Sequence, residues 1–268
     1  MKILYFYFII FFFCFVLNKI VYSFELISKD KFFEENKIKI KVMFLRKNKG
    51  KLQWFWQSKS KNEPKYKGEI NQGLPHGIGE INFNNSRANS IKKYFGEWKN
   101  GKFHGRGEII WFNGHVYKGE FKFGEKDGQG TLNFANGRSY VGQFKSGKYN
   151  GKGKFNFENK DENLENYDGY WLNGKLNGIG SYFYQNGDRY IGEFKENKKH
   201  GHGKYNWVNG KEYVGEFYND IISGFGILTK ANGSKFIGEF NDGITWEGIF
   251  YNVNEHQSIE IWNGGKIK

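Results

Sequence analysis

Several residue types that support common folds and sites are scarce in this chain of 268 residues. The single cysteine, Cys14, excludes a disulfide within the chain and a zinc site built from its cysteines. Proline contributes 2 residues, whereas glycine contributes 37 and aromatic residues make up 20% of the chain. A disordered chain would be poor in aromatic residues, and the apolar periodicity of helices is almost lacking. The composition therefore predicts an all-β protein with many tight turns.

Acidic residues are scarce in one part of the chain. Residues 1–65 contain 14 Lys and Arg against 5 Asp and Glu, whereas residues 66–268 contain 27 against 23. Most of the net charge of +13 thus lies ahead of residue 66. A basic segment of this kind favours anionic lipid or nucleic acid, while the nearly balanced remainder is typical of an ordinary solvated surface.

One long apolar run, residues 3–17, opens the chain. As a helix it would span about 22 Å, which is short of the hydrocarbon core of about 30 Å. This length suits a secretory signal peptide cut after Ser23, so that residues 1–23 are a signal peptide or a signal anchor. In an uncleaved anchor, Lys19, Lys29 and Lys31 outnumber Lys2 and would leave the rest of the chain in the cytosol. A wrongly assigned start site is the third reading, and the side of the membrane stays open.

Residues 24–65 form a basic capping or linker segment. Lys37 to Val42 alternates strictly between basic and apolar residues, which predicts a strand, and residues 52–57 predict a second strand after a turn. The resulting hairpin would cap the array that follows, with lysines keeping its edge soluble. A patch for anionic lipid headgroups is the sharper alternative, and nucleic acid is disfavoured because no recognised motif accompanies the charge. The patch would consist of Lys37, Lys39, Lys41, Arg46, Lys47, Lys49 and Lys51.

Eight repeat units fill residues 66–250. They open at an aromatic residue, namely Tyr66, Tyr94, Tyr117, Tyr140, Tyr167, Tyr190, Tyr213 and Phe236. Glycine stands two residues after this position, and a second aromatic stands four residues after it in seven units: Trp98, Phe121, Phe144, Trp171, Phe194, Phe217 and Phe240. Seven units also contain a Gly-x-Gly pair: Gly77 with Gly79, Gly105 with Gly107, Gly128 with Gly130, Gly151 with Gly153, Gly178 with Gly180, Gly201 with Gly203 and Gly224 with Gly226.

Steps of two residues place the aromatic residues and the glycines on one face of a two-stranded hairpin. Glycine weakens a strand, so its recurrence indicates that an aromatic ring of the same or an adjacent unit lies against the backbone. A glycine at the eighth position of most units and Asn-Gly pairs near the unit ends supply the turns. Stacked hairpins then bury their aromatic faces against each other, and sixteen strands predict a rod of about 75 Å with a groove.

The segment from Tyr94 to Gly107 resembles the MORN repeat, Tyr-x-Gly-x-Trp-x-x-Gly-x-x-His-Gly-x-Gly. The resemblance covers residues 66 to about 250. It implies an elongated single-layer meander of antiparallel β-hairpins, here behind an apolar N-terminal helix segment. The eighth unit has Glu247 and Ile249 at the positions of the glycine pair, which predicts a terminal cap, and residues 251–268 are expected to close the array.

We expect no catalytic, cofactor-binding or metal-binding site in these repeats. The glycine pairs continue into neither a dinucleotide-binding nor a P-loop pattern, and no catalytic constellation is readable, so neither a cofactor nor an enzymatic activity is predicted. His76, His104 and His200 share one unit position with Asp127, Asn150, Asn177 and Ser223. Such a set of small polar groups favours hydrogen bonds in turns over metal binding.

Together these observations predict a non-catalytic scaffold or binding module at or near a membrane. The MORN resemblance implies protein partners such as a cytoskeletal or organelle scaffold, and anionic membrane lipid as a further ligand. A secreted protein that binds carbohydrate or a cell surface is the alternative, and dimerisation of arrays through their open edges also stays open.

Overall fold

The computed structural model describes residues 33–84, 90–157, 165–253, 259–263 and 266–267. The predicted apolar helix segment, the signal sequence and its cleavage site lie outside these residues. Within the described part of the chain, no helix combines the length and the hydropathy needed to span a membrane.

Two-residue turns join the two strands of each unit. In the second unit, Asn100 and Gly101 both have positive φ, 51° and 75°, which is the conformation of a type I′ hairpin turn. The sixth and seventh units lack this glycine, and Asn197 and Asp220 adopt the same conformation there, with φ of 71° and 75°. Asparagine and aspartate tolerate the left-handed region better than other side chains, which explains why they replace glycine.

Three-residue turns join consecutive units at the other ends of the strands wherever the units follow at a spacing of 23 residues. After the second unit, the Gly114 amide donates to the Trp111 carbonyl at 3.1 Å, and Gly114 has a φ of 85°. The Asn113 side chain accepts a hydrogen bond from the His115 amide at 3.1 Å and so stabilises the turn from within. Two kinds of turn therefore form the two long rims of the molecule.

Between these turns the described residues form twenty strands. They are β1 (Lys41–Asn48), β2 (Lys51–Phe55), β3 (Lys65–Asn71), β4 (Leu74–Asn82), β5 (Ile91–Lys99), β6 (Lys102–Trp111), β7 (Val116–Lys122), β8 (Glu125–Asn133), β9 (Ser139–Lys145), β10 (Lys148–Asn156), β11 (Asn166–Leu172), β12 (Lys175–Phe183), β13 (Arg189–Lys195), β14 (Lys198–Asn206), β15 (Glu212–Tyr218), β16 (Ile221–Thr229), β17 (Lys235–Asn241), β18 (Ile244–Tyr251), β19 (Ile259–Asn263) and β20 (Lys266–Ile267).

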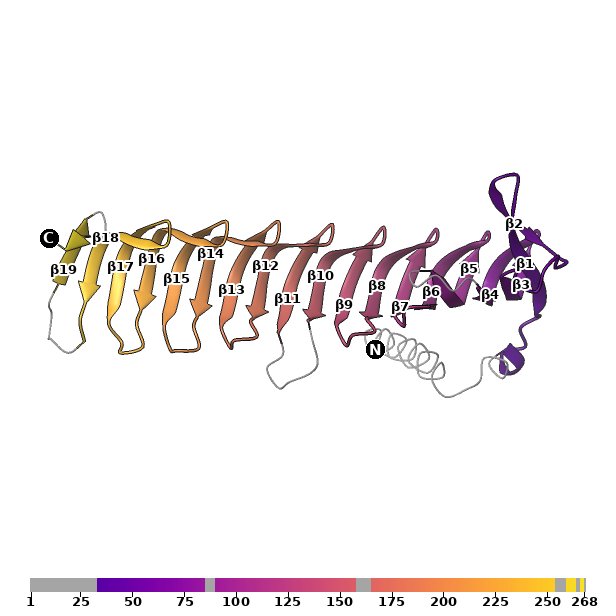
Figure 1. Ribbon diagram of the computed structural model, residues 1–268, viewed down its shortest axis with the longest axis horizontal. Helices are drawn as coiled ribbons and strands as arrows, with labels where there is room; N and C mark the ends of the chain where they lie inside the picture. The colour runs from indigo at the N-terminus through magenta and orange to yellow at the C-terminus, as the bar shows by residue number, and fades with distance from the viewer. Residues whose placement is uncertain (1–32, 85–89, 158–164, 254–258, 264–265, 268) are drawn as a thin grey trace, which may run out of the picture.

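A single antiparallel sheet contains all twenty strands. Strands β3 to β19 each pair with the next strand along the chain, and β1 pairs with both β2 and β3. Figure 1 shows the resulting elongated shape, in which the strands lie across the long axis. This confirms the all-β meander of hairpins: the eight units supply the sixteen expected strands, β3 to β18, and the flanking segments extend the sheet by β1 and β2 at one end and by β19 and β20 at the other.

The hairpin ahead of the first unit is present, but its first strand was placed wrongly. Lys37 has a φ of 52° and ends a helical turn at Phe33, where the Ile38 amide donates to the Phe33 carbonyl at 3.0 Å. The alternating pattern is therefore interrupted, and β1 begins only at Lys41. Lys49 and Gly50 form its turn, so β2 spans Lys51–Phe55 instead of residues 52–57.

The eighth unit does not end the sheet, which corrects the prediction of a terminal cap. Its strand β18 pairs with β17 on one side and with β19 on the other. Gly248 lies opposite Gly238, as the glycines of other units do, but its β-bulge is one residue shorter: two residues separate Thr245 from Gly248, whereas three separate Lys126 from Gly130 in the third unit. The glycine was overlooked because this missing residue moves it out of the regular spacing.

Each tyrosine that opens a unit lies over two glycines of its own hairpin. In the third unit Gly119 pairs with Gly130, and the ring and hydroxyl of Tyr117 occupy the space where a Cβ of Gly130 would be. The same hydroxyl donates to the Glu120 carbonyl at 3.0 Å, so the ring is held at both ends. Tyr117 is fully buried although the sheet has a single layer. The ring expected against the glycine backbone thus comes from the same unit.

The second glycine of the Gly-x-Gly pair has this role in every unit that a tyrosine opens. In each case the tyrosine ring and hydroxyl take the space that a Cβ would need, and the backbone φ is not positive. These positions therefore require glycine for its lack of a side chain and not for a left-handed backbone. Besides Gly130, they are Gly79, Gly107, Gly153, Gly180, Gly203 and Gly226.

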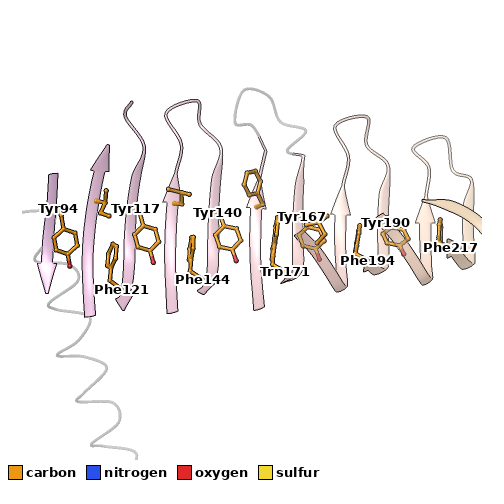
Figure 2. Close-up of a cluster of buried hydrophobic side chains, with 14 of the residues drawn as sticks. Tyr94, Tyr117, Phe121, Tyr140, Phe144, Tyr167, Trp171, Tyr190, Phe194 and Phe217 are labelled. Carbon is orange, nitrogen blue, oxygen red and sulfur yellow. The ribbon is translucent and has the colours of Figure 1, made fainter. Parts of the chain in front are cut away.

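The second aromatic of each unit separates these tyrosines. Phe121 contacts Tyr117 of its own unit at 5.1 Å between ring centroids and Tyr94 of the preceding unit at 5.3 Å, both edge to face. Figure 2 shows that the same alternation continues along the sheet. We call this series the ring ladder; it contains Tyr66, Tyr94, Trp98, Tyr117, Phe121, Tyr140, Phe144, Tyr167, Trp171, Tyr190, Phe194, Tyr213, Phe217, Phe236 and Phe240.

The first glycine of each pair lies in a β-bulge beneath an acidic or amide side chain. Gly128 has a φ of 106°, and the Glu120 carboxylate covers it and accepts a hydrogen bond from the Gln129 amide at 3.2 Å. The same bond recurs in five other units; in the fifth unit Tyr170 takes the place of the acidic residue and covers Gly178. The remaining first glycines, all with positive φ, are Gly77, Gly105, Gly151, Gly201 and Gly224.

Gly130→Val is expected to destabilise the chain by about 3 kcal/mol, because Tyr117 is buried and hydrogen-bonded and cannot move aside. Chemical denaturation measures this change. The matched control is Gln129→Val, which places valine at the neighbouring, exposed position on the opposite face. Equal stability of the two variants would contradict the placement of the ring over the glycine.

Candidate functional site

The face of the sheet that contains the ring ladder also presents a row of half-buried rings. These rings stand seventeen residues after the opening aromatic of their units, close to the three-residue turns, and they pack against the core. We call them the outer aromatic row; it contains Phe83, Trp111, Phe134, Phe157, Tyr184 and Trp207. Consecutive units are two strands apart, so the rings recur about every 10 Å along the rod.

Two lysines lie among the rings of this face. The Nζ atom of Lys126 is 5.2 Å from the ring centroid of Phe144, 5.6 Å from that of Tyr117 and 5.9 Å from that of Trp111. Burial lowers the pKa of Lys126. Lys199 stands at the same unit position and lies 5.6 Å from the ring centroids of Tyr184 and Tyr205. Such distances allow cation–π attraction.

Asp188 is a buried carboxylate at the rim formed by the three-residue turns. It accepts hydrogen bonds from the Tyr205 hydroxyl at 2.8 Å, the Val208 amide at 2.9 Å and the Asn186 side chain at 3.0 Å. Burial opposes its ionisation, but these three donors outweigh burial and hold the pKa of Asp188 below its ordinary value. The carboxylate therefore fastens two successive turns together. His115, at the same unit position in the second unit, accepts from the Ala135 amide at 3.0 Å.

The opposite face of the sheet is different. Two open hollows of about 540 and 450 Å³ lie there beside the two-residue turns, lined by charged and polar residues such as Glu97, Arg106 and Lys122. Farther along the same face, Ile179 and Phe225 are 64% and 58% exposed. The sequence predicted a groove along the rod. The hollows that the described residues form lie on the face that does not contain the ring ladder.

The histidine position fulfils its predicted role in some units only. Asp127 accepts a hydrogen bond from the Ser146 amide at 3.4 Å, and Asn150 accepts from the Asn173 amide at 3.5 Å, so both fasten the two-residue turn of the next unit. The Nδ1 atoms of the three histidines at this position are buried without a hydrogen-bond partner: His76, His104 and His200. The described residues contain no group of His, Cys, Asp or Glu that could hold a metal ion.

The seven basic residues predicted as a lipid patch do not all lie together. Lys47, Lys49 and Lys51 meet at the exposed tip of the β1–β2 hairpin, while Lys37, Lys39 and Lys41 are exposed along the chain that leads to β1. Arg46 has other partners, because it forms an ion pair with Glu63 at 3.1 Å and stacks on Phe55 at 3.7 Å. The hairpin tip is the part of this set that remains accessible to an anionic surface.

The fold and the ring ladder define a class of protein, a repeat protein built from stacked antiparallel hairpins. A family model described as the MORN repeat matches residues 66–86, 94–116, 117–137, 140–162, 167–189, 190–212 and 213–235. These segments cover more than half of the chain, which therefore belongs to the MORN repeat family. Members of this family generally use the repeat for binding and not for catalysis.

No curated protein matches the chain. Among solved structures, it is similar to the SAS-4 (dCPAP) TCP domain in complex with a proline-rich motif of Ana2 (dSTIL) from Drosophila melanogaster. That match has 15% sequence identity and a TM-score of 0.36, and it covers 58% of this chain and 83% of the other.

Sequence reasoning did not identify Lys126 or Asp188 as notable residues. The tenth position of the units, where Lys126 stands, contains proline, phenylalanine, tyrosine, leucine or isoleucine in five other units. The presence of lysine at this otherwise apolar position in two units was the signal that could have identified Lys126. Nothing comparable marks Asp188, because two of its three donors, Tyr205 and Val208, come from the next unit.

The buried tyrosines predict that the fold is lost in alkali. Burial raises the pKa of Tyr149, Tyr184 and Tyr213 to about 12, above the ordinary value of about 10. Because the folded state binds these protons more tightly, the stability they contribute is complete below pH 10 and is lost as the pH rises towards 12. Titration of tyrosinate absorbance together with circular dichroism is expected to show ionisation and unfolding in one step. Ionisation of most tyrosines near pH 10 with the fold intact would contradict their burial.

Proposed function

We propose that this chain is a non-catalytic binding module of a scaffold, whose aromatic face binds an exposed segment of a protein partner. The outer aromatic row carries the proposal, because it places solvent-accessible rings at one position in six successive units. Aromatic residues are enriched where proteins bind each other, since they offer a large contact area with few rotatable bonds.

Rigidity of the face also supports this function. Each ring of the outer row stands at the end of a strand that pairs on both sides, or one residue beyond it, and packs against the core that contains the ring ladder. A partner would therefore meet side chains that are already ordered, and binding would cost little conformational entropy. The buried Asp188 is saturated by three donors, which suits a structural brace and not a general acid or base.

Proximity to a membrane is a further part of the proposal. It rests on the excess of basic residues ahead of residue 66 and on the three lysines at the exposed tip of the β1–β2 hairpin. Lysines near an anionic bilayer contribute about 1 kcal/mol each to binding. Such an arrangement fits a scaffold that links a membrane to a cytoskeletal or organelle protein, the kind of partner that the MORN resemblance implies.

Site-specific photocrosslinking in the cells that make the protein tests the proposal. p-Benzoylphenylalanine replaces Phe134 in the outer aromatic row or, as a matched control, Ile179 on the opposite face. We expect a covalent protein adduct from position 134 only. The same cells, fractionated before irradiation, are expected to show chain and partner in the membrane fraction.

Two outcomes would contradict the proposal. A protein adduct from position 179 alone would move the binding surface to the opposite face. An adduct with a glycan instead of a protein at position 134 would favour the alternative of a secreted carbohydrate-binding protein.

A further inference from the structure

Lys126 and Lys199 are equivalent residues in different chemical settings. Both stand nine residues after the opening tyrosine of their units, and both ammonium groups lie among three rings. The backbone beside them is also the same, because the Lys126 carbonyl accepts from the Gly147 amide and the Lys199 carbonyl accepts from the Asp220 amide, both at 2.9 Å. The two sites can therefore be compared atom by atom.

Of the two lysines, only Lys199 is paired with a carboxylate. Its Nζ atom lies 3.4 Å from Asp220 Oδ1, and the Tyr184 hydroxyl is also 3.4 Å away. At the Lys126 site, Gly147 occupies the position of Asp220, and Trp111 occupies that of Tyr184. No carboxylate in the described part of the chain pairs with Lys126. The site in the third unit thus has the cation and the rings but lacks the anion that completes the site in the sixth.

We propose that Lys126 is an anion-binding subsite of the aromatic face and takes the carboxylate of an aspartate or glutamate in the partner segment, with an adjacent apolar side chain on the rings of Trp111 and Phe144. This inference rests on the proposed function and specifies the chemistry of the bound segment. The equivalent pair of Lys199 and Asp220 shows the geometry that the partner would reproduce.

Desolvation makes this subsite selective for an acidic residue. Burial already lowers the pKa of Lys126, so its charged form is less stable than in water, and a carboxylate would restore that stability. An ion pair among rings is screened less by water and salt than an exposed pair. The surrounding rings also require that the residues flanking the acid be apolar, which a chain segment satisfies.

A bilayer fits the subsite less well than a chain segment does. Lys126 is half-buried between rings, whereas the lysines of the β1–β2 hairpin tip are exposed and stand together. Lipid headgroups in a flat surface would reach the hairpin tip more readily than Lys126. Binding of anionic vesicles through Lys126 is therefore an outcome that would count against the proposal.

Gly147→Asp is the variant that the comparison suggests. Gly147 has a φ of 79°, close to the 75° of Asp220, and no atom lies within 4 Å of the Cβ that it would gain. The new carboxylate is expected to pair with Lys126 as Asp220 pairs with Lys199. It would occupy the subsite from within and compete with a partner carboxylate, while the turn keeps its conformation.

A displayed library of random seven-residue peptides provides the test, with the full-length chain as the target. Seven extended residues span at most about 25 Å, which is less than the about 29 Å between the third and sixth units, so a peptide at Lys126 does not reach Lys199. We expect enrichment of peptides with an aspartate or glutamate beside an apolar or aromatic residue. Lys126→Met and Gly147→Asp are each expected to lower the affinity of the chain for an enriched synthetic peptide by at least about tenfold.

Lys154→Met is the matched control, because it removes the same charge from an exposed position on the opposite face of the fourth unit. It should leave the affinity of the peptide unchanged. Thermal melting of all variants shows that they remain folded, and Gly147→Asp is expected to melt no lower than the wild-type chain.

Three results would overturn the inference. Enriched peptides without acidic residues, or acidic peptides that bind Lys126→Met as tightly as wild type, would leave the proposed function standing without this subsite. Loss of binding to phosphatidylserine vesicles in Lys126→Met, with peptide binding intact, would assign the lysine to a membrane. If no peptide is enriched, the inference fails, while photocrosslinking at Phe134 still decides the proposed function.

Discussion

The fold depends on one repeated contact, a tyrosine ring packed against a pair of glycines. A single-layer sheet has no second layer to cover its apolar face, so the rings themselves must exclude water. Gly119 and Gly130 leave space for the Tyr117 ring, and the hydrogen bond from its hydroxyl to the Glu120 carbonyl prevents it from swinging out. The ring of Phe144 in the next unit then closes the side that would remain open. Burial in this protein is therefore achieved along the rod and not between layers.

This arrangement also explains how a binding surface arises. Because the ring ladder occupies the strand centres, the rings nearer the three-residue turns are covered only in part and form the outer aromatic row. The units are alike in backbone but differ in the side chains that they place around these rings. Lys126 lacks the carboxylate that Asp220 supplies to Lys199, so equivalent positions in different units present different chemistry. A repeat array can in this way distinguish partners without any change of fold.

Much of the fold followed from the sequence because the spacing of 23 residues recurs and its aromatic residues and glycines share one parity. The turns were also predictable, since asparagine and glycine stand where φ is positive. The start of β1 was not, because the helical turn at Phe33 depends on packing against Phe95. Gly248 was missed for a different reason, the shorter bulge of its unit. The contact between the tenth position of one unit and the eighth position of the next, which pairs Lys199 with Asp220, required the register of the sheet.

The account predicts that units are coupled through their rings and not only through backbone hydrogen bonds. A double-mutant cycle on Tyr117 and Phe144, whose rings meet across a unit boundary at 5.1 Å and 83°, measures this coupling most directly. Chemical denaturation of the two single leucine variants and the double variant should give a coupling of about 0.5–1.5 kcal/mol. If the two single changes in the free energy of unfolding sum to that of the double variant within about 0.3 kcal/mol, the ring ladder does not connect the units.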